Sequence, residues 1–441
     1  MDAIEGIPYS AAEFDKGGKL LRKPTVPAGT TDLIVVSHGW NNDREAAEAL
    51  YLKLFKNFAD VTRGDAAIAA RKIAIVGVIW PSKKFDDLLT MASGGTAAGG
   101  AASAGAGAGG GAASEQAALH AAIDRAAPLF DDPGDAERLK TLHGLIAKLD
   151  GNPQLQVQFV QTLRELVAPA GVTGNEATRE DREDLFFRGA ADAIFANASR
   201  PPTPGTGAAG ASAAAGSGHA AGLGSVFSKI GNAVTGLVNL TTYFEMKKRA
   251  GDVGQLGLAP LIDELAGQVE RVHLIGHSFG GRLVAAAAAH STTPKLHSLA
   301  LLQAAFSHNG FSSSRNGFFR TVAESGRVAG PILITHTKND RAVGVAYPIA
   351  SRVGQDSASA LGDKDDQFGA IGSNGAQQMN AGMIAAETNK LLPVGGVYAW
   401  QPKRFHNLDA TPFVVDPNGG DAHGFVFVRE VAWAISRAIV S

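Results

Sequence analysis

The chain has 441 residues, 45% of them hydrophobic and 19% charged, so it is long enough to bury a large core in one or more domains. A formal net charge of −2 provides no basic field and argues against nucleic acid as a partner. Cysteine is absent, which excludes disulfides and cysteine-ligated metals. Because neither a secretory signal nor a membrane span is recognisable, we expect a cytoplasmic protein, with non-classical secretion left open.

Apolar runs alternate with amphipathic segments in the first ninety residues. The runs 32–40 (DLIVVSHGW) and 72–82 (KIAIVGVIWPS) are predicted strands. The segment 41–60 between them has the spacing of an amphipathic helix, with Asn42 or Asp43 as its expected N-cap. Fully apolar strands separated by helices are typical of a parallel sheet that is covered on both faces.

This alternation is interrupted over residues 91–240. The segments 91–114 and 199–222 are rich in Gly and Ala, cannot form a core, and are predicted to be flexible tethers. Between them we predict helices over 115–127, 134–150, 153–168 and 178–198. The whole segment is therefore expected to be a helical insertion, with a lid as its candidate role.

Apolar strands resume after the insertion, over 271–276, 297–306 and 331–337. The last segment, 424–440, is predicted to be a helix alone or a strand followed by a helix. The sequence as a whole predicts an α/β protein with a doubly wound, mostly parallel sheet. Residues 1–90 and 241–441 form its core, and 91–240 form the insertion.

Ser278 stands at the junction of a predicted strand and a predicted helix, in the sequence GHSFG. It is the only serine in the chain that fits the pattern Gly-x-Ser-x-Gly. This context is that of a nucleophile elbow, a tight strand-to-helix turn that exposes the serine hydroxyl. Gly276 and Gly280 permit a strained backbone and close packing of helix on strand. The alternative is a plain glycine turn, since the chain contains 54 glycines.

A serine nucleophile needs a general base, and the base needs an orienting acid. At an elbow of this kind the chain order is Ser, then Asp or Glu, then His. His423, in a Gly-rich loop near the end, is the preferred base, and His406 is the alternative. Asp340, just after the predicted strand 331–337, is the preferred acid. Four acids with a weaker context are the alternatives: Asp363, Asp365, Asp366 and Asp421.

A tetrahedral intermediate also needs two backbone N–H groups to stabilise its oxyanion. Phe279, directly after the nucleophile, is predicted to supply one. Trp40, in the turn HGW after the first apolar strand, is predicted to supply the other. We expect His38 and Gly39 of this turn, and His277 beside the nucleophile, to contact the substrate. The alternative is that HGW is only a tight turn.

Together, GHSFG, HGW, Asp340 after a strand and the late AHG around His423 resemble the α/β-hydrolase superfamily. The resemblance covers about 32–90 and 240–441. It implies a covalent acyl-enzyme on Ser278 and, without any cofactor, hydrolysis of a small-molecule or lipid ester, as in carboxylesterases and lipases. VVSHGWNND and GVIWPS are also similar to motifs of bacterial serine hydrolases. The turn departs from the Gly-rich HGGG form of some lipases and esterases.

Two other functions compete with this one. An inactive α/β-hydrolase fold would bind a ligand or protein partner through the insertion. A membrane-acting lipase or toxin would use the segment 224–251, which has an apolar face and a basic end at 247–249. We expect this segment to be a core helix with a solvated end, with lid and lipid-surface helices as alternatives. No metal cluster is recognised, and DPNGGD (416–421) has the wrong residue order for a calcium loop.

Overall fold

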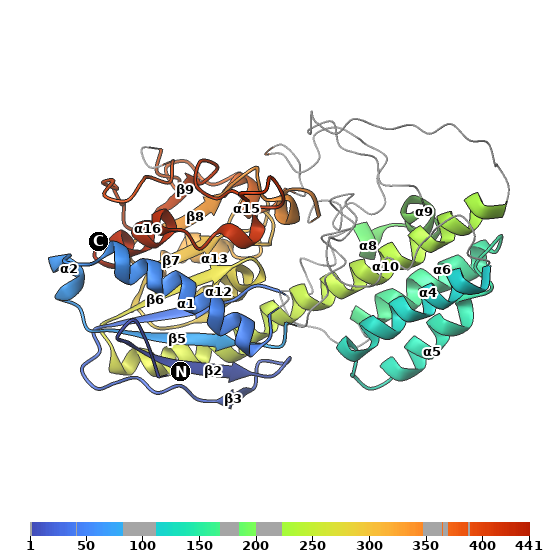
Figure 1. Ribbon diagram of the computed structural model, residues 1–441, viewed down its shortest axis with the longest axis horizontal. Coiled ribbons are helices and arrows are strands. Elements are labelled where there is room, and N and C mark those ends of the chain that lie inside the picture. Colours follow the sequence, from blue (N-terminus) through green and yellow to red (C-terminus); the bar gives the residue numbers. More distant parts are fainter. Residues whose placement is uncertain are drawn as a thin grey trace. The chain divides into compact units, whose positions relative to one another are not determined.

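The structure is a computed structural model that describes residues 2–40, 42–82, 112–167, 185–199, 223–346, 364, 369–386 and 389–441. These residues form two compact units (Figure 1). One unit contains the described residues of 1–86, 246–348 and 362–441, and the other contains those of 87–245 and 349–361.

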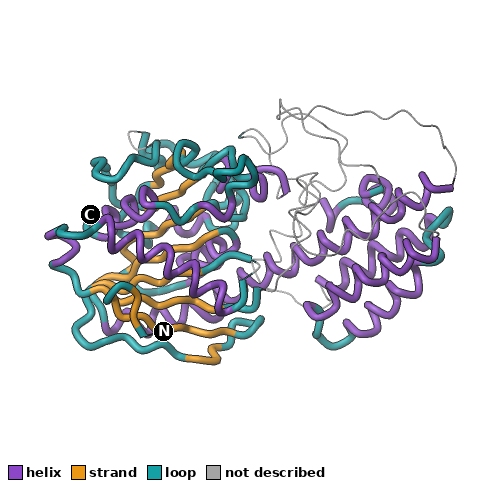
Figure 2. The backbone as a smooth tube through the Cα atoms, viewed as in Figure 1, coloured by secondary structure: helices purple, strands orange, loops and turns teal. Residues whose placement is uncertain are grey.

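The first unit is built on a mixed, mostly parallel sheet that has nine strands in the described residues (Figure 2). The strands are β1 (Ala3–Ile4), β2 (Ile7–Phe14), β3 (Leu20–Arg22), β4 (Asp32–Ser37), β5 (Ile73–Ile79), β6 (Arg271–His277), β7 (Leu296–Leu302), β8 (Ile332–His336) and β9 (Phe405–Asp409). Their order is β1-β2-β5-β4-β6-β7-β8-β9, with β3 beside β2. Only the pairs β1–β2 and β2–β3 are antiparallel among these strands. The expected α/β class is therefore confirmed.

The chain changes direction across the sheet between β4 and β6. From β4 it passes through α1 (Arg44–Val61) to β5 on one side, and it later returns to β6 on the other side. Parallel crossover connections are right-handed. A helix in a crossover toward one edge of the sheet therefore covers the opposite face from a helix in a crossover toward the other edge. Every residue of β4 is buried, as expected for a strand covered on both faces. Ligands of open α/β sheets bind outside the carboxyl ends of strands at such a switch point.

Helices on the two faces form separate packing groups. On one face α1 packs against α16 (Arg429–Ile439) over a core that includes Phe55 and Ile435 (Figure 1). The Asp43 carboxylate accepts a hydrogen bond from the Ala46 N–H at 2.9 Å and caps α1, which confirms one of the two expected caps. On the other face α12 (Phe279–His290) packs against η2 (Val253–Leu258) and α11 (Ala259–Leu265). The shorter helices of this unit are α2 (Ala66–Ala69), η3 (Ala266–Gln268), α13 (Arg320–Ser325), η4 (Ala342–Ala346), α15 (Ile371–Asn374) and η5 (His423–Phe425).

Two predicted elements end differently in the structure. The strand expected over 297–306 stops at Leu302, because Gln303 adopts φ +41° and turns the chain out of the sheet. The segment 424–440 contains no strand. It begins in the short helix η5 and continues as α16, whose buried positions recur at helical spacing.

The second unit is helical in its described residues. Its helices are α4 (Ala112–Ala126), η1 (Ala127–Leu129), α5 (Asp135–Ile146), α6 (Pro153–Val167), α8 (Leu185–Arg188) and α9 (Ala191–Ala198), together with residues 223–245 of α10 (Leu223–Asp252). Three of the four helices predicted here are confirmed. The fourth, predicted over 178–198, is divided in its described part, because Gly189 and Ala190 separate α8 from α9, and its residues 178–184 lie outside the described residues. The predicted tethers lie almost wholly outside the described residues, at 91–111 and 200–222.

The helix predicted over 224–251 is α10, and its apolar face is in the core as expected. Val234, Leu237 and Phe244 are each at most 1% exposed. The expectation of a solvated basic end is wrong, because Lys247 and Arg249 are buried. The reason is that α12 lies against this end, where the Arg282 Nε–H donates a hydrogen bond to the Lys247 carbonyl at 3.0 Å.

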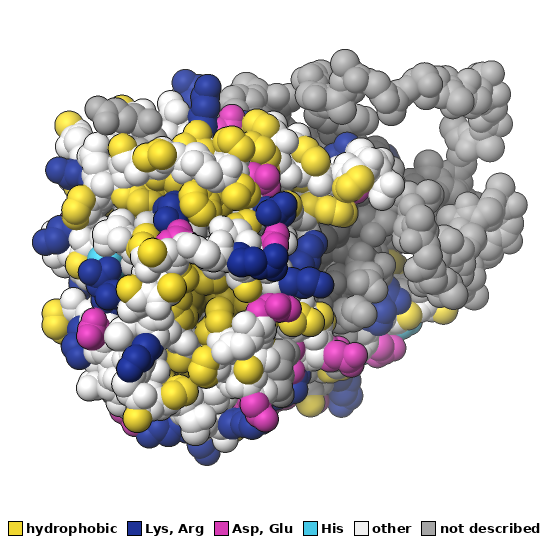
Figure 3. Space-filling view, turned by 60° about the vertical axis from the view of Figure 1, so that its left-hand side comes forward, with side chains coloured by type: hydrophobic (Ala, Val, Ile, Leu, Met, Phe, Trp, Pro, Cys, Tyr) yellow, Lys and Arg dark blue, Asp and Glu magenta, His cyan; other side chains and the backbone are white. Residues whose placement is uncertain are grey.

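On the face shown in Figure 3, cationic and anionic side chains are interspersed among apolar ones. Within the described ranges, no helix has both the length and the apolar character required to cross a membrane.

Candidate active site

Ser278 occupies a strained turn between β6 and α12. Its φ of +56° is rare for a residue with a side chain and costs about 1–3 kcal/mol. Three backbone hydrogen bonds hold the turn: the Ser278 N–H donates to the Leu302 carbonyl at 3.1 Å, and the Ser278 carbonyl accepts from the N–H groups of Gly281 and Ala305. The strain is therefore imposed by the neighbouring strand and helix, as at a nucleophile elbow.

The glycines on either side of Ser278 are required by close backbone contacts. A Cβ atom at Gly276 would lie 2.3 Å from the Gly280 carbonyl oxygen. A Cβ atom at Gly280 would lie 2.3 Å from the His38 carbonyl oxygen, on the neighbouring strand end. The pattern Gly-x-Ser-x-Gly thus lets α12 start against the ends of β4 and β6, which confirms the predicted reason for these glycines.

We expect the substitution Gly280→Ala to lower the free energy of unfolding by about 1–3 kcal/mol, because backbone atoms must move to admit the methyl group. Gly267→Ala is the matched control, since a Cβ atom there meets nothing within 4 Å. Urea unfolding of both variants measures the difference. Equal midpoints for the two variants would show that the elbow does not need a glycine at 280.

The side chains of Ser278, His423 and Asp340 form one hydrogen-bonded chain. The Ser278 hydroxyl donates to His423 Nε2 at 2.9 Å, and His423 Nδ1–H donates to Asp340 Oδ2 at 2.7 Å. Asp340 is 1% exposed, and its other carboxylate oxygen accepts from the Val343 N–H at 3.1 Å. The structure therefore brings together the three residues that the sequence singled out as nucleophile, base and acid.

The loops that carry Asp340 and His423 are tied to each other. Asp421 accepts from the backbone N–H groups of Arg341, at 2.8 Å, and His423, at 3.2 Å. Asp421 thus caps its own loop, as the sequence suggested, and also joins the acid loop to the base loop. His406 lies in β9, where its Nε2 accepts from the Gln401 N–H at 3.2 Å, so it is not the base. The other candidate acids, Asp363, Asp365 and Asp366, lie outside the described residues.

The surroundings of His423 favour its protonated form. Burial lowers the pKa of His423, but the charge and hydrogen bond of Asp340, with a further contribution from Asp421, outweigh it and leave the pKa raised. Burial raises the pKa of Asp340, although the contact with His423 opposes this shift. Such perturbed groups in direct contact are typical of sites that move protons.

The turn HGW lies directly against the nucleophile. A Cβ atom at Gly39 would be 2.7 Å from Ser278 Cβ, so glycine is needed for the two segments to meet. The ring of Trp40 lies 5.9 Å from the ring of Phe279. The two residues predicted to supply oxyanion donors are therefore side by side at the carboxyl ends of β4 and β6.

His38 supports this turn from within the core, and its expected contact with substrate stays a prediction. It is 1% exposed, and its Nδ1–H donates to the Gly39 carbonyl at 2.8 Å. The ring stacks on Trp80, whose indole N–H donates to the His38 carbonyl at 3.1 Å. Burial lowers the pKa of His38 to about 4, which keeps the ring neutral. Its Nε2 accepts from the Trp80 backbone N–H at 3.4 Å, so both ring nitrogens are engaged by the protein.

Further polar residues that sequence reasoning missed hold the turn in place. The Ser82 hydroxyl donates to the Gly39 carbonyl at 3.1 Å, and the Asn42 side-chain amide donates to the Trp40 carbonyl at 2.9 Å. The Tyr51 hydroxyl accepts from the His38 N–H at 2.8 Å. The sequence offered one signal for Ser82, the motif WPS at 80–82, in which a polar residue follows the end of an apolar strand.

His277 is likewise buried, at 6% exposure, and its expected contact with substrate stays a prediction. Its Nε2–H donates to the backbone carbonyl of His423 at 2.9 Å. The imidazole therefore contacts the segment that carries the base.

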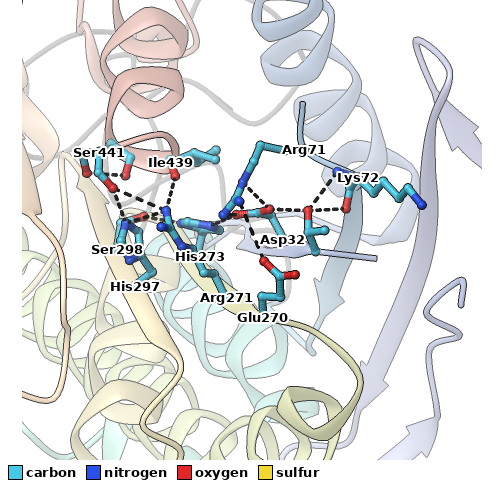
Figure 4. A network of polar contacts seen from close by, with 12 residues as sticks. Asp32, Arg71, Lys72, Glu270, Arg271, His273, His297, Ser298, Ile439 and Ser441 are labelled. Carbon is cyan, nitrogen blue, oxygen red and sulfur yellow. Dashed lines mark hydrogen bonds and ion pairs between the residues drawn. The ribbon is translucent and has the colours of Figure 1, made fainter. Parts of the chain in front are cut away.

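A second Asp–His–Ser chain lies in the interior of the same unit (Figure 4). His273 Nε2–H donates to Asp32 Oδ1 at 3.1 Å, and the Ser298 hydroxyl donates to His273 Nδ1 at 2.8 Å. The three residues are at most 5% exposed. Asp32 in β4 is in register with Arg271, and His273 in β6 is in register with Ile34, away from the carboxyl ends of both strands. Arg71 contacts Asp32 at 2.8 Å. This chain is a buried structural network.

The Asp32 network predicts acid sensitivity of the fold. Burial raises the pKa of Asp32, but hydrogen bonds from His273 and Thr31 and the charges of His273 and Arg71 leave it lowered. A lowered folded-state pKa gives stability above the unfolded value near 3.9, and this stability is lost as the pH falls through the folded-state pKa. At pH 7, Asp32→Asn is expected to cost about 1.5–3 kcal/mol in unfolding free energy. Urea unfolding over pH 3–7 tests this, and a difference that does not shrink with falling pH would contradict it.

Comparison of the chain with family models, curated proteins and solved structures found no match. In the part of the chain that the structure describes, no three His, Asp or Glu side chains are grouped so as to hold a metal ion. What the site does must therefore be inferred from its own geometry.

Proposed function

We propose that the protein is a serine hydrolase of the α/β-hydrolase type that cleaves carboxylic esters through an acyl-enzyme on Ser278. The observation that carries the proposal is the hydrogen-bonded chain from Ser278 through His423 to Asp340, which starts at a strained strand-to-helix turn. A serine hydroxyl bonded to an imidazole whose other nitrogen faces a buried carboxylate has the geometry of an activated nucleophile.

The arrangement supports a two-step reaction. Ser278 Oγ attacks the acyl carbon as its proton passes to His423 Nε2, and Asp340 stabilises the resulting imidazolium. The N–H groups of Phe279 and Trp40 stabilise the oxyanion. The tetrahedral intermediate collapses, the alkoxide leaves with the proton from His423, and an ester to Ser278 remains. Water then gives a proton to His423 and attacks this ester. His423 returns that proton to Ser278 Oγ as the bond to the acyl carbon breaks, which releases the acid and restores the serine.

The fold supports the same proposal. Ser278 follows β6, Asp340 follows β8 and His423 follows β9, in the chain order Ser, Asp, His that accompanies this type of elbow. All three lie beyond the carboxyl ends of parallel strands, at the edge where open α/β sheets bind ligands. Esters are favoured over amides because their leaving groups depart more easily, and this preference is an analogy with the superfamily.

The rate of ester hydrolysis is expected to rise with pH. Only neutral His423 can accept the serine proton, and its raised pKa places the midpoint above the usual histidine value of about 6.5. A profile of kcat/KM for a soluble p-nitrophenyl ester over pH 5–9 measures this midpoint. A midpoint below 6 would contradict the assigned contact between His423 and Asp340.

Hydrolysis of p-nitrophenyl acetate and of longer esters by the full chain tests the proposed activity. A burst of one p-nitrophenolate per chain, followed by steady turnover, is expected if the acyl-enzyme forms. Higher activity on micellar than on monomeric ester would favour a membrane-acting lipase. A folded protein that shows neither the burst nor the steady turnover would contradict the proposal and favour a binding protein with an inactive fold.

A further inference from the structure

His277 immediately precedes the nucleophile and is enclosed by the segment that carries the base. Its ring centre lies 4.7 Å from that of His423 and 5.4 Å from that of Phe427. On the opposite side it meets the turn HGW, because a Cβ atom at Gly39 would lie 3.2 Å from His277 Nδ1. The imidazole thus separates the base segment from the oxyanion turn.

The two nitrogens of His277 have different surroundings. Nε2–H donates to the His423 carbonyl at 2.9 Å, which fixes the tautomer and leaves a lone pair on Nδ1. Nδ1 is buried and accepts no hydrogen bond from another part of the protein that the structure describes. A buried acceptor without a partner has a cost in free energy. The hydrogen bond from Nε2–H is therefore the one polar contact in the described residues that could account for a histidine here.

Burial also keeps His277 uncharged. It lowers the pKa of His277 well below the usual histidine value, and the neighbouring His423 lowers it further. This neutrality matters, because a second positive charge 4.7 Å from His423 would oppose the imidazolium that forms when the base takes the serine proton. A neutral donor can hold His423 without this penalty.

We propose that His277 is a positioning residue for the base: its Nε2–H holds the His423 backbone, so that the His423 ring bridges Ser278 and Asp340. The inference rests on the proposed function of Ser278. Contacts on three sides then fix the base, since Asp421 binds the His423 N–H, Asp340 binds the ring and His277 binds the carbonyl. Without the last contact, η5 can shift and lengthen the bond between His423 Nε2 and Ser278 Oγ.

Three substitutions in the full chain separate this role from simple packing. His277→Phe keeps a ring but removes the donor. His277→Asn keeps an N–H donor, but on a side chain too short to reach the His423 carbonyl. His277→Gln places an amide N–H near the position of Nε2. His406→Phe is the matched control, because His406 is buried in β9 and bonds only to Gln401 among the described residues.

We expect His277→Phe and His277→Asn to lower kcat by about 10²-fold with little change in KM, since a displacement of about 1 Å in a catalytic group has an effect of this size. His277→Gln is expected to recover most of the loss, and His406→Phe to behave like the wild type. Wild-type rates in folded His277→Phe or His277→Asn protein, or a loss in His277→Gln equal to that in His277→Phe, would overturn the proposal.

The proton between His423 Nδ1 and Asp340 supplies a readout that needs no substrate. Its low-field NMR resonance is expected in the wild type and in His277→Gln, and is expected to be lost or broadened in His277→Phe and His277→Asn. Unchanged resonances in all four proteins would overturn the positioning role. A wild type with this resonance but without reaction at Ser278 would instead contradict the proposed function, so the two failures are distinguishable.

Discussion

Replacing Ser278 by alanine is expected to lower kcat for ester hydrolysis by about 10⁶-fold, the size of effect seen when a serine protease loses its nucleophile. The substitution removes the oxygen that bonds to His423 Nε2 and that is proposed to form the acyl-enzyme. Residual hydrolysis would come from the oxyanion donors and substrate binding alone. Steady-state rates on a p-nitrophenyl ester, with circular dichroism to confirm folding, measure the effect.

Ser298→Ala is the matched control for this substitution. Ser298 is also a serine bonded to a histidine that faces an aspartate, but it belongs to the buried network of Figure 4. Its loss is expected to leave kcat unchanged while lowering stability. Comparable activity in Ser278→Ala and the wild type would show that another residue is the nucleophile.

Replacing Asp340 by asparagine is expected to lower kcat by about 10⁴-fold, as at the corresponding position of a serine protease. The asparagine amide can donate to His423 Nδ1 and so stabilise the tautomer that carries its proton on Nε2, which cannot accept from Ser278. The variant also loses the negative charge that raises the pKa of His423, so the midpoint of its residual pH profile is expected to fall.

Asp32→Asn is the matched control for Asp340→Asn, since both carboxylates are buried and accept from a histidine. The control is expected to be less stable but to keep its kcat at neutral pH. A loss of less than tenfold in Asp340→Asn would show that the assigned acid does not orient the base.

The three residues of the proposed triad could be found from the sequence because each follows a recognisable strand or Gly-rich loop. Ser278 has a local pattern, and chain order then limited the choice of acid and base to a few residues. Sequence patterns do not give distances, however, so the bonds that join positions 83 and 145 residues apart emerged only in the structure. Residue type alone would not separate this chain from Asp32, His273 and Ser298, which differ by their place in the sheet.

What could not be predicted depends on long-range packing. The sequence assigned His38 and His277 to the substrate because both lie beside functional residues, but it did not show the backbone contacts by which each supports a neighbouring segment. The basic end of α10 reads as solvated until α12 is placed against it. β9 was missed because its sequence, FHNLD, contains isolated apolar residues and lacks the apolar run of a central strand.

The most direct test of the central claim is the reaction of the purified full chain with a fluorophosphonate, followed by intact mass and peptide mapping. The account predicts a single adduct on Ser278 that is absent from Ser278→Ala and is slowed in Asp340→Asn. A folded wild-type protein that forms no adduct, or an adduct that maps to another serine, would contradict the assignment of Ser278 as an activated nucleophile.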